Sequence, residues 1–230
     1  MDGRPTPMDY TFQFSSVWVA MPRLLDGARL TILLSITTIV IGLFIGIVCA
    51  LARTSGSRWL RWPAATYVEV IRNSPFLVQL FLIYFGLPSL GIRLDPIHAA
   101  LIGMSVNCGA YATEIVRSGI DAIPRGQLEA ARALGFPVPA IVRHVILFPA
   151  LRAVFPALAS QFILVMLGSA VISTISVEEL TGVAHSVETE NFRPFEVYLV
   201  VTGIYVTLAF ALKVTFAGVD RFLFQTRGRA

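Results

Sequence analysis

Several polar side chains interrupt the long apolar stretches of this sequence, and they are the residues most suited to bind a small molecule. Amides and hydroxyls bind and orient polar solutes, because they donate and accept hydrogen bonds without carrying charge. Each of these residues could line a passage for a solute, or could only hold helices together. The set, with the proline that follows its first two members, is Asn73, Ser74, Pro75, Gln79, Tyr84, Asn107, Gln161, Ser169 and Ser173.

Motifs of catalysis are missing from the sequence. No GxxxxGK[ST] phosphate-binding loop occurs, since the lysine Lys213 is followed by Val214. HExxH, GxSxG and a clustered pair of carboxylates are absent too. The three histidines are scattered, and the two cysteines lie in apolar runs. We therefore expect a chain that is not an enzyme, binds no metal and holds no cofactor of its own.

The dipeptide before Pro75 can be interpreted in two ways. Asn73 or Ser74 could cap a half-helix that begins at the proline, because a capping side chain and a proline suit a helix start. Such a helix N-terminus can face the carboxylate of a substrate. The other interpretation is a simple kink.

Ser169 and Ser173 are four residues apart, which places them on one face of an α-helix.

The composition indicates that these polar groups are held by membrane-spanning helices. Hydrophobic residues make up 56% of the 230 residues and charged residues 14%, whereas a soluble domain carries about 25% charged residues. The sequence therefore predicts an all-α polytopic membrane protein. Five apolar segments are expected to span the membrane: 30–52, 75–90 with an approach from 63, 96–116, 148–177 and 195–218.

Arginines alternate between the connecting segments. They gather in 53–72, in 117–152 and at the C-terminus, whereas 178–196 is mainly acidic. By the positive-inside rule, the arginine-rich segments are cytoplasmic and the N-terminus is outside. We expect residues 1–23 to form an extracytoplasmic segment, 24–222 a transmembrane domain and 223–230 a cytoplasmic tail. Glu114, at the inner end of its span, is expected to pair with Arg117 or Arg72.

One short charged segment, GQLEAARALGFP at 126–137, lies in the longest cytoplasmic connection. Pro124 suits a helix start, Gly135 suits a C-terminal cap, and the prolines that follow prevent continuation. Alanines leave one side of this helix nearly bare, so a partner's groove could accept it. An ordinary solvated turn is the alternative.

The same segment resembles the signature of permease subunits of ATP-binding-cassette (ABC) importers, in which three residues separate Glu-Ala-Ala from a following Gly. Residues 68–88, 107–136 and 192–200 are similar to the polar amino-acid uptake branch, the histidine and glutamine permease type. The resemblance extends from about Leu24 to Phe222. It implies a type I importer permease fold with a five-helix core in the bacterial cytoplasmic (inner) membrane.

The resemblance also implies the partners. Two permeases, identical or related, would enclose one path for an amino acid or similar small polar solute. Two cytoplasmic ATPase subunits, which bind ATP and Mg, would dock on the coupling helix at about 124–137, and an extracytoplasmic solute-binding protein would deliver the solute. The residues implied in docking are Gly126, Glu129, Ala130, Ala131 and Gly135.

The sequence departs from many relatives in the fourth span. A Lys-Asp-Thr-Ser sequence is replaced there by Leu167-Gly168-Ser169-Ala170, so the charged pair is absent. A neutral or zwitterionic solute, or a partner permease that carries the charges, is then expected. An ion-driven carrier without an ATPase is the alternative function. It predicts an acidic residue in the middle of a span, and the sequence has none.

Overall fold

The computed structural model describes residues 10–225 except 138–139, 142–144 and 146. All regular elements in these residues are helical. In chain order they are α1 (Ser15–Val19), α2 (Met21–Thr54), α3 (Arg58–Arg72), α4 (Phe76–Phe81), η1 (Leu82–Gly86), η2 (Leu87–Leu90), α5 (Pro96–Asp121), α6 (Arg125–Ala133), α8 (Phe148–Gly168), η4 (Ser169–Ile175), α9 (Leu180–Asn191), α10 (Pro194–Asp220) and η5 (Arg221–Gln225).

Four of these helical segments are long and apolar enough to cross a membrane. They are 21–54, 96–121, 148–175 and 194–224. The second predicted span is instead a pair of segments, 58–72 and 76–90, which meet at an angle of 109°. The predicted count of five therefore holds only if the bent pair counts as one span. The break falls at Asn73-Ser74-Pro75, because proline lacks the N–H that would continue the helix.

Small residues allow α2 and α5 to approach closely. Gly42 and Gly46, four residues apart, face α5 in the spacing typical of close membrane-helix contacts. A Cβ added at Gly46 would lie 2.6 Å from the Cβ of Ala112, and one added at Gly42 would lie 2.7 Å from the Sγ of Cys108. A larger side chain at either glycine would therefore separate the two central helices.

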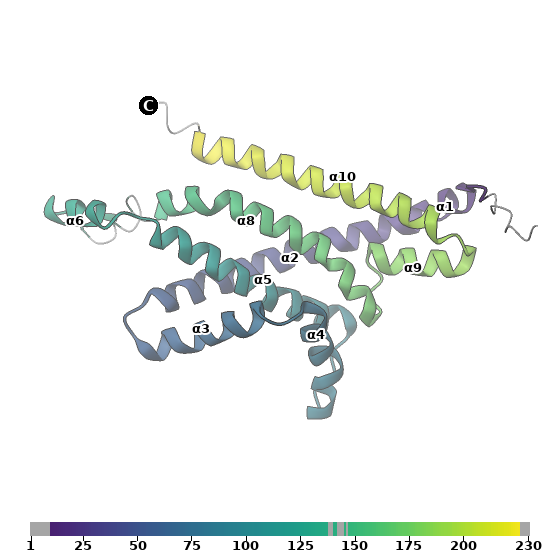
Figure 1. Ribbon diagram of the computed structural model, residues 1–230, viewed down its shortest axis with the longest axis horizontal. Helices are drawn as coiled ribbons and strands as arrows, with labels where there is room; N and C mark the ends of the chain where they lie inside the picture. The colour runs from purple at the N-terminus through teal and green to yellow at the C-terminus, as the bar shows by residue number, and fades with distance from the viewer. Residues whose placement is uncertain (1–9, 138–139, 142–144, 146, 226–230) are drawn as a thin grey trace, which may run out of the picture.

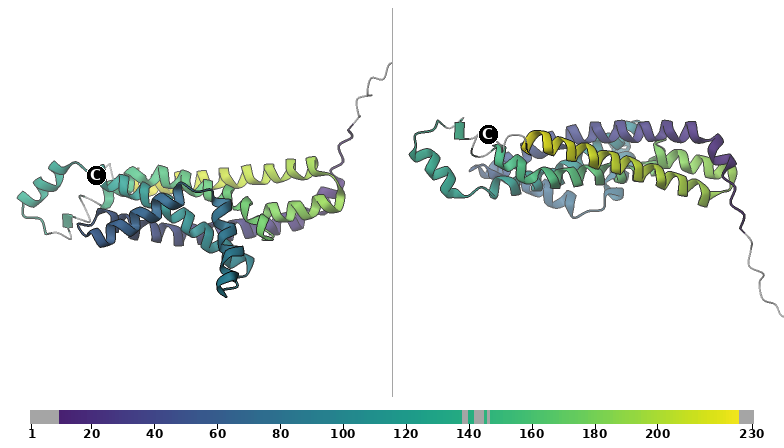
Figure 2. Two further views of the ribbon diagram at one scale, coloured as in Figure 1. Left: turned by 60° about the horizontal axis from the view of Figure 1, so that its bottom comes forward. Right: turned by 90° about the horizontal axis from the view of Figure 1, so that it is seen from above.

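The helices form an elongated bundle whose two ends differ (Figures 1 and 2). At one end lie α6, the connection from α2 to α3 and the end of α10. At the opposite end lie α1 and α9. The connections predicted to be cytoplasmic thus gather at one end, and the acidic segment lies at the other. Which end faces the cytoplasm stays a prediction.

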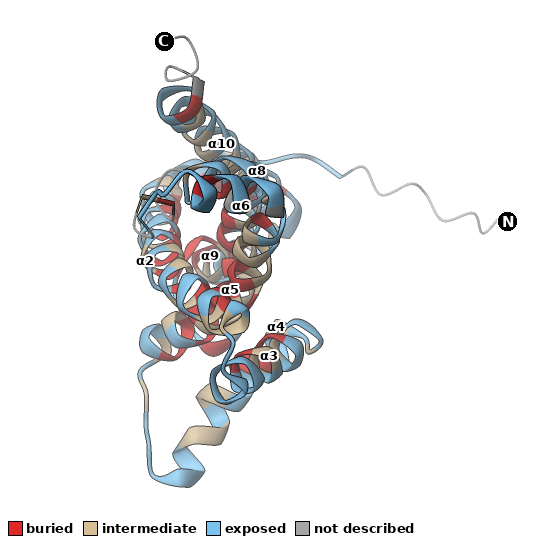
Figure 3. Ribbon diagram, turned by 90° about the vertical axis from the view of Figure 1, so that its left-hand side faces the viewer, coloured by how far each residue is buried: buried red, intermediate tan, exposed pale blue. Residues whose placement is uncertain are grey.

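The apolar interior has two parts. One cluster joins α2, α4, α5, α8 and η4, and the other joins α1, α2, α9 and α10. Viewed from the α6 end, buried residues face the inside of the ring of helices, and the outer faces are exposed (Figure 3). Those outer faces carry large apolar side chains such as Phe44, 69% exposed, and Phe210, 66% exposed. This is the pattern expected of helices that face lipid.

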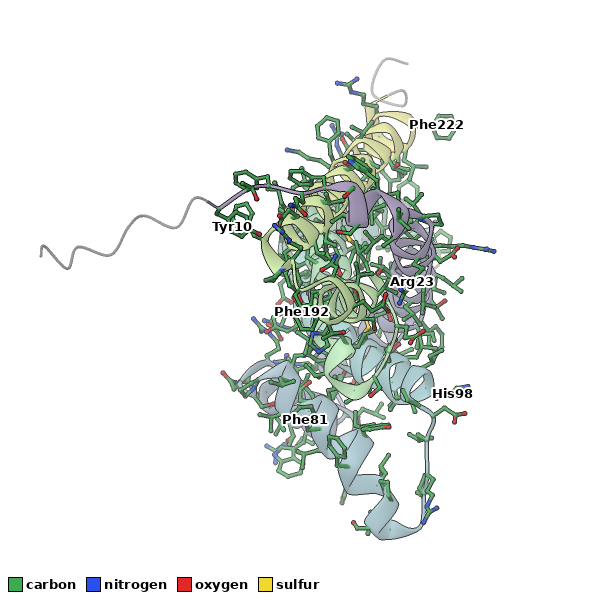
Figure 4. All side chains as sticks on the ribbon, turned by 90° about the vertical axis from the view of Figure 1, so that its right-hand side faces the viewer. Tyr10, Arg23, Phe81, His98, Phe192 and Phe222 are labelled. Carbon is green, nitrogen blue, oxygen red and sulfur yellow. The ribbon has the colours of Figure 1, made fainter. Side chains whose placement is uncertain are left out.

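The segment from α4 to η2 projects sideways from the bundle (Figure 1). Its root is fixed in the core by Leu80, which is fully buried. Farther out, Phe81 and Phe85 pack edge to face, with ring centroids 5.4 Å apart. Figure 4 shows Phe81 on this segment, on the side of the bundle away from α10.

The N-terminal residues are tied to the α9–α10 corner. The Tyr10 hydroxyl donates to the Glu196 carboxylate, and the backbone N–H of Gln13 donates to the same group over 3.1 Å. Arg23 of α2 forms a salt bridge of 2.8 Å with Glu190 of α9. Figure 4 shows Tyr10 and Arg23 at this end of the molecule. Residues 10–23 therefore pack on the bundle; residues 1–9 and 226–230 of the predicted terminal segments lie outside the described part.

Candidate functional site

A hollow of about 340 Å3 lies between the root of α4, α5 and the end of α8. Its polar lining groups are the amides of Asn107 and Gln161 and the hydroxyl of Tyr111. The other lining residues are Phe76, Met104, Leu164, Val165, Gly168 and Val171. No charged side chain belongs to this lining in the described part of the chain. The guanidinium of Arg72, however, lies 5.4 Å from the centroid of the Tyr111 ring.

Gln79 orients one of these amides. Its side-chain oxygen accepts a hydrogen bond of 3.0 Å from the Asn107 amide. Its own amide donates to the backbone oxygens of Ile71 and Ser74, over 2.8 and 3.0 Å, and to the Ser74 hydroxyl. Gln79 is only 8% exposed. It therefore closes the gap between α3 and α4 and fixes Asn107, and it is not itself among the residues that line the hollow.

The predicted cap of a half-helix at Pro75 is wrong. Helix α4 has six residues and no side-chain cap. The Ser74 hydroxyl donates to the Val70 oxygen over 2.8 Å, and the Asn73 amide donates to the Glu69 oxygen over 2.8 Å. Both side chains thus satisfy the last carbonyls of α3 rather than the first N–H groups of α4. The kink is the interpretation that fits.

The shared face predicted for Ser169 and Ser173 is also wrong, because residues 169–175 form a 3-10 helix. With three residues per turn, positions four apart differ by about 120°. The Ser169 hydroxyl donates to the Met166 oxygen at the end of α8, and the Ser173 hydroxyl donates to the Ala170 oxygen of η4. Neither serine lines the hollow, whereas their neighbours Gly168 and Val171 do.

Tyr84 lies outside the hollow as well. It belongs to the π-helical turn η1 and is half-buried. Its ring packs edge to face on Phe85, with centroids 4.9 Å apart. Of the nine residues predicted to line a path, the hollow therefore contains Asn107 and Gln161, while Asn73, Ser74, Pro75 and Gln79 build the adjacent break in the helix.

Sequence reasoning missed a buried carboxylate. Glu179 is fully buried and caps α9, accepting from the N–H groups of Thr181 and Gly182 over 2.9 and 3.0 Å. The hydroxyls of Tyr205 on α10 and Thr31 on α2 also donate to it, over 2.8 and 3.1 Å. Burial raises the pKa of Glu179, and these hydrogen bonds oppose the rise. The sequence signal that could have identified this cap is the position of Glu179 directly before a helix, two and three residues ahead of Thr181 and Gly182.

A second carboxylate organises the end of the bundle near α6. Glu114 of α5 pairs with Arg117 over 3.0 Å and with Arg72 of α3 over 3.8 Å, as expected from the sequence. Arg53 of α2 also contacts it. Arg117 also forms a salt bridge with Asp121, the last residue of α5. The ends of three helices are therefore linked through one side chain directly before the α5–α6 connection.

Helix α6 has the predicted start and end. It begins after Pro124, and Gly135 has a φ of 74°, the left-handed conformation that glycine adopts most easily. The N–H of Phe136 bonds to the Ala131 oxygen, and the N–H of Gly135 bonds to the Arg132 oxygen. These two bonds form a Schellman cap. The helix is well formed and is not a loose turn.

The surface of α6 is largely free in this single chain. Gly126, Glu129, Ala130 and Gly135 are exposed, but Ala131 is 6% exposed and so faces its own chain, contrary to the expected bare alanine side. Leu134 and Phe136, which the sequence reasoning did not include, are 76% and 53% exposed. Two large apolar side chains are therefore exposed directly after α6, the helix that lies at one tip of the molecule (Figures 1 and 2).

Comparison with known proteins gives consistent results. Residues 42–224 match the family described as "Binding-protein-dependent transport system inner membrane component". The chain is 35% identical over 212 residues to the glutamine transport system permease protein GlnP of Escherichia coli (strain K12), which covers 91% of this chain and 97% of that one. It is 36% identical over 222 residues to the L-cystine transport system permease protein TcyB of Bacillus subtilis (strain 168), covering 96% and 93%.

Two solved structures share the arrangement of helices. An amino acid ABC transporter crystallised with histidines has a TM-score of 0.87 at 34% identity, and the match covers 93% of this chain and 100% of that one. The MetNI methionine ABC transporter in an inward-facing conformation has a TM-score of 0.70 at 21% identity, with 92% and 99% covered. The second likeness concerns the fold alone.

Proposed function

Because the chain belongs to the family of binding-protein-dependent transport system inner membrane components, we propose that it is the permease subunit of an ATP-driven importer of amino acids or related small polar solutes. The family consists of transport permease subunits rather than enzymes, and the chain is a multi-pass protein of the bacterial cytoplasmic membrane. The fold is that of the type I ABC importer permeases. Membership of this family speaks against the ion-driven alternative.

The hollow beside Asn107 and Gln161 is the proposed solute site. Neutral amides and one phenol can bind the polar groups of an amino acid through hydrogen bonds. A charged side chain of the solute would find no opposite charge in this lining, so its desolvation would be unfavourable. The names of two relatives refer to glutamine and cystine, amino acids whose ammonium and carboxylate groups balance to no net charge at neutral pH. We propose a solute of that class.

Helix α6 is the proposed coupling helix. Energy must enter from a partner, since the sequence has no phosphate-binding loop. In this proposal the partner is a pair of cytoplasmic ATPase subunits that bind ATP and Mg, and the chain itself holds no cofactor. A second permease, identical or related, and an extracytoplasmic solute-binding protein complete the importer. ATP-driven closure of the ATPases would move α6 as a rigid lever.

The single observation that carries this proposal is the free, capped helix α6 with Leu134 and Phe136 exposed beyond it. Burying one leucine in a partner's groove contributes about 1.5–3 kcal/mol. Its loss therefore weakens docking at least about tenfold.

The test compares Leu134→Ser with Leu60→Ser. Leu60 is 57% exposed near the same end of the bundle but belongs to α3. We expect Leu134→Ser to reduce recovery of the ATPase with the solubilised permease and to reduce solute uptake, while Leu60→Ser changes neither. Unchanged recovery and uptake with Leu134→Ser would contradict the docking role of α6.

A further inference from the structure

A long apolar groove runs between α2 and α10 on the outside of the bundle. Its volume is about 790 Å3, and it is a separate feature from the hollow at Asn107. Helix α10 packs on α8 and α9, which leaves this gap beside α2. The lining residues are Leu25, Ala28, Arg29, Ile32, Leu33, Ile36, Val200, Gly203, Ile204, Thr207 and Leu208.

The groove has room because Gly203 puts no side chain into its α10 wall. A Cβ added at Gly203 would meet no atom within 4 Å, so this position opens directly into the groove. Opposite it, Leu33 and Ile36 of α2 are 60% and 53% exposed. The floor is closed by Ile204 and Leu208, which pack on the cluster under α9 and α10. The groove is therefore lined almost entirely by hydrocarbon.

Arg29 is the cationic residue in the lining of this groove, and its depth in the membrane can be inferred from the sequence of α2. Arg29 is exposed and directly precedes the uncharged stretch 30–52 of α2, which places its guanidinium at the edge of the hydrocarbon layer. Ile36 lies seven residues deeper, about 10 Å at 1.5 Å per residue. Within the described part of the chain, Arg29 forms no ion pair within 4.0 Å, not even with Asp26 one turn earlier.

We propose that this groove binds one anionic phospholipid, whose phosphate contacts Arg29 and whose acyl chain lies between α2 and α10. A guanidinium matches a phosphate in charge and in its paired N–H donors. From Arg29 the apolar groove extends along α2 toward Ile36, that is, into the hydrocarbon layer, as an acyl chain does from its phosphate. The proposal concerns a lipid site and does not depend on which solute is transported.

A helix of a second permease is the competing occupant. Such a helix would cover Arg29, and a covered guanidinium without a counter-charge is strongly unfavourable. A phospholipid avoids this cost, because its phosphate supplies the charge at the height of Arg29 and its chain supplies the apolar contact. The charge and the shape of the groove thus favour the lipid.

The experiment uses the full chain, purified in mild detergent with the subunits that accompany it. The protein is titrated with phosphatidylglycerol or with zwitterionic phosphatidylcholine of the same acyl chains, and native mass spectrometry measures how many lipids are bound. We expect one tightly bound lipid, with phosphatidylglycerol preferred about fivefold, the ratio that one arginine near a membrane surface supports. Arg29→Gln should remove the preference for phosphatidylglycerol and leave weaker binding of both lipids.

Two variants of the same helix separate the groove from general effects. Gly203→Leu places a side chain in the groove and should reduce binding of both lipids. Gly218→Leu is the matched control, because Gly218 is also open and lies on α10 but not in the groove. Leucine is a better helix former than glycine, so neither change disfavours the helix. Binding in Gly218→Leu should equal that of the unaltered chain.

Three results would overturn the proposal. The first is equal binding of the two lipids by the unaltered chain. The second is a preference for phosphatidylglycerol that persists in Arg29→Gln. The third is a Gly203→Leu variant that retains its lipid but is recovered without a second permease, which would assign the groove to a partner helix.

Discussion

Gln79 and Gln161 look alike in the sequence, as single amides in apolar segments, but the structure gives them different roles. Gln79 is 8% exposed and makes hydrogen bonds to the Ile71 and Ser74 oxygens and to the Asn107 amide. Gln161 lines the hollow and makes no hydrogen bond within the part of the chain that the structure describes. Replacing each by leucine should therefore have opposite consequences for stability and transport.

The magnitude for Gln79→Leu follows from its partners. The change leaves two backbone oxygens and one amide without their bonds. A polar interaction between membrane helices contributes on average about 0.6 kcal/mol, and an unsatisfied buried group costs about 1–3 kcal/mol. We expect a destabilisation of about 1–3 kcal/mol in total. For Gln161→Leu we expect a change within about 0.5 kcal/mol, as for surface substitutions.

The assay measures both properties. Unfolding of the purified permease in detergent gives the loss of stability, and uptake by the reconstituted importer gives kcat and KM. Gln161→Leu should raise KM with little loss of stability. In a double-mutant cycle, Gln79→Leu and Asn107→Leu should couple by about 0.6 kcal/mol, because they share a hydrogen bond. Equal destabilisation by Gln161→Leu and Gln79→Leu would contradict these two roles.

Three further predictions concern packing and charge. Gly46→Val should destabilise the chain by about 1–3 kcal/mol through overpacking against Ala112, and Gly56→Val, which meets no atom within 4 Å, is the control for unfolding measurements. Glu114→Gln should reduce uptake more than it reduces ATPase recovery, because it loosens three helix ends while leaving α6 intact; equal losses would contradict this. Burial raises the pKa of Glu179, so the stability of the unaltered chain relative to Glu179→Gln should be greatest below the ordinary glutamate pKa of about 4.3 and fall as pH rises above it. A pH-independent difference between the two would exclude that shift.

The periodic and compositional features were predictable from the sequence. Long uncharged segments predicted the helices, and the distribution of arginines predicted which connections lie at the same end of the bundle. The limits of α6 followed from Pro124 and Gly135, because a proline start and a left-handed glycine are local requirements. The partners of Glu114 were also predictable, since Arg117 lies one turn away on the same helix.

Features that depend on contacts between distant segments were not predictable. The role of Gln79 arises from its position between α3, α4 and α5, which no local pattern specifies. Ser169 and Ser173 were placed on one face because an α-helix was assumed, whereas the chain tightens to a 3-10 helix there. The sequence shows Glu179 only as one of several acids in the connecting segment 178–196. Its burial depends on Thr31 and Tyr205, which are far from it in sequence.

The most direct test of the account is photo-crosslinking from α6 in intact membranes. A photoreactive amino acid replaces Leu134 in one variant and Leu90 in another; both leucines are 76% exposed, but Leu90 ends η2 on the projecting segment. We predict that position 134 crosslinks to an ATP-hydrolysing subunit, identified by mass spectrometry, and that position 90 does not. Absence of that product from position 134, or equal yields from both positions, would contradict α6 as the point where energy enters.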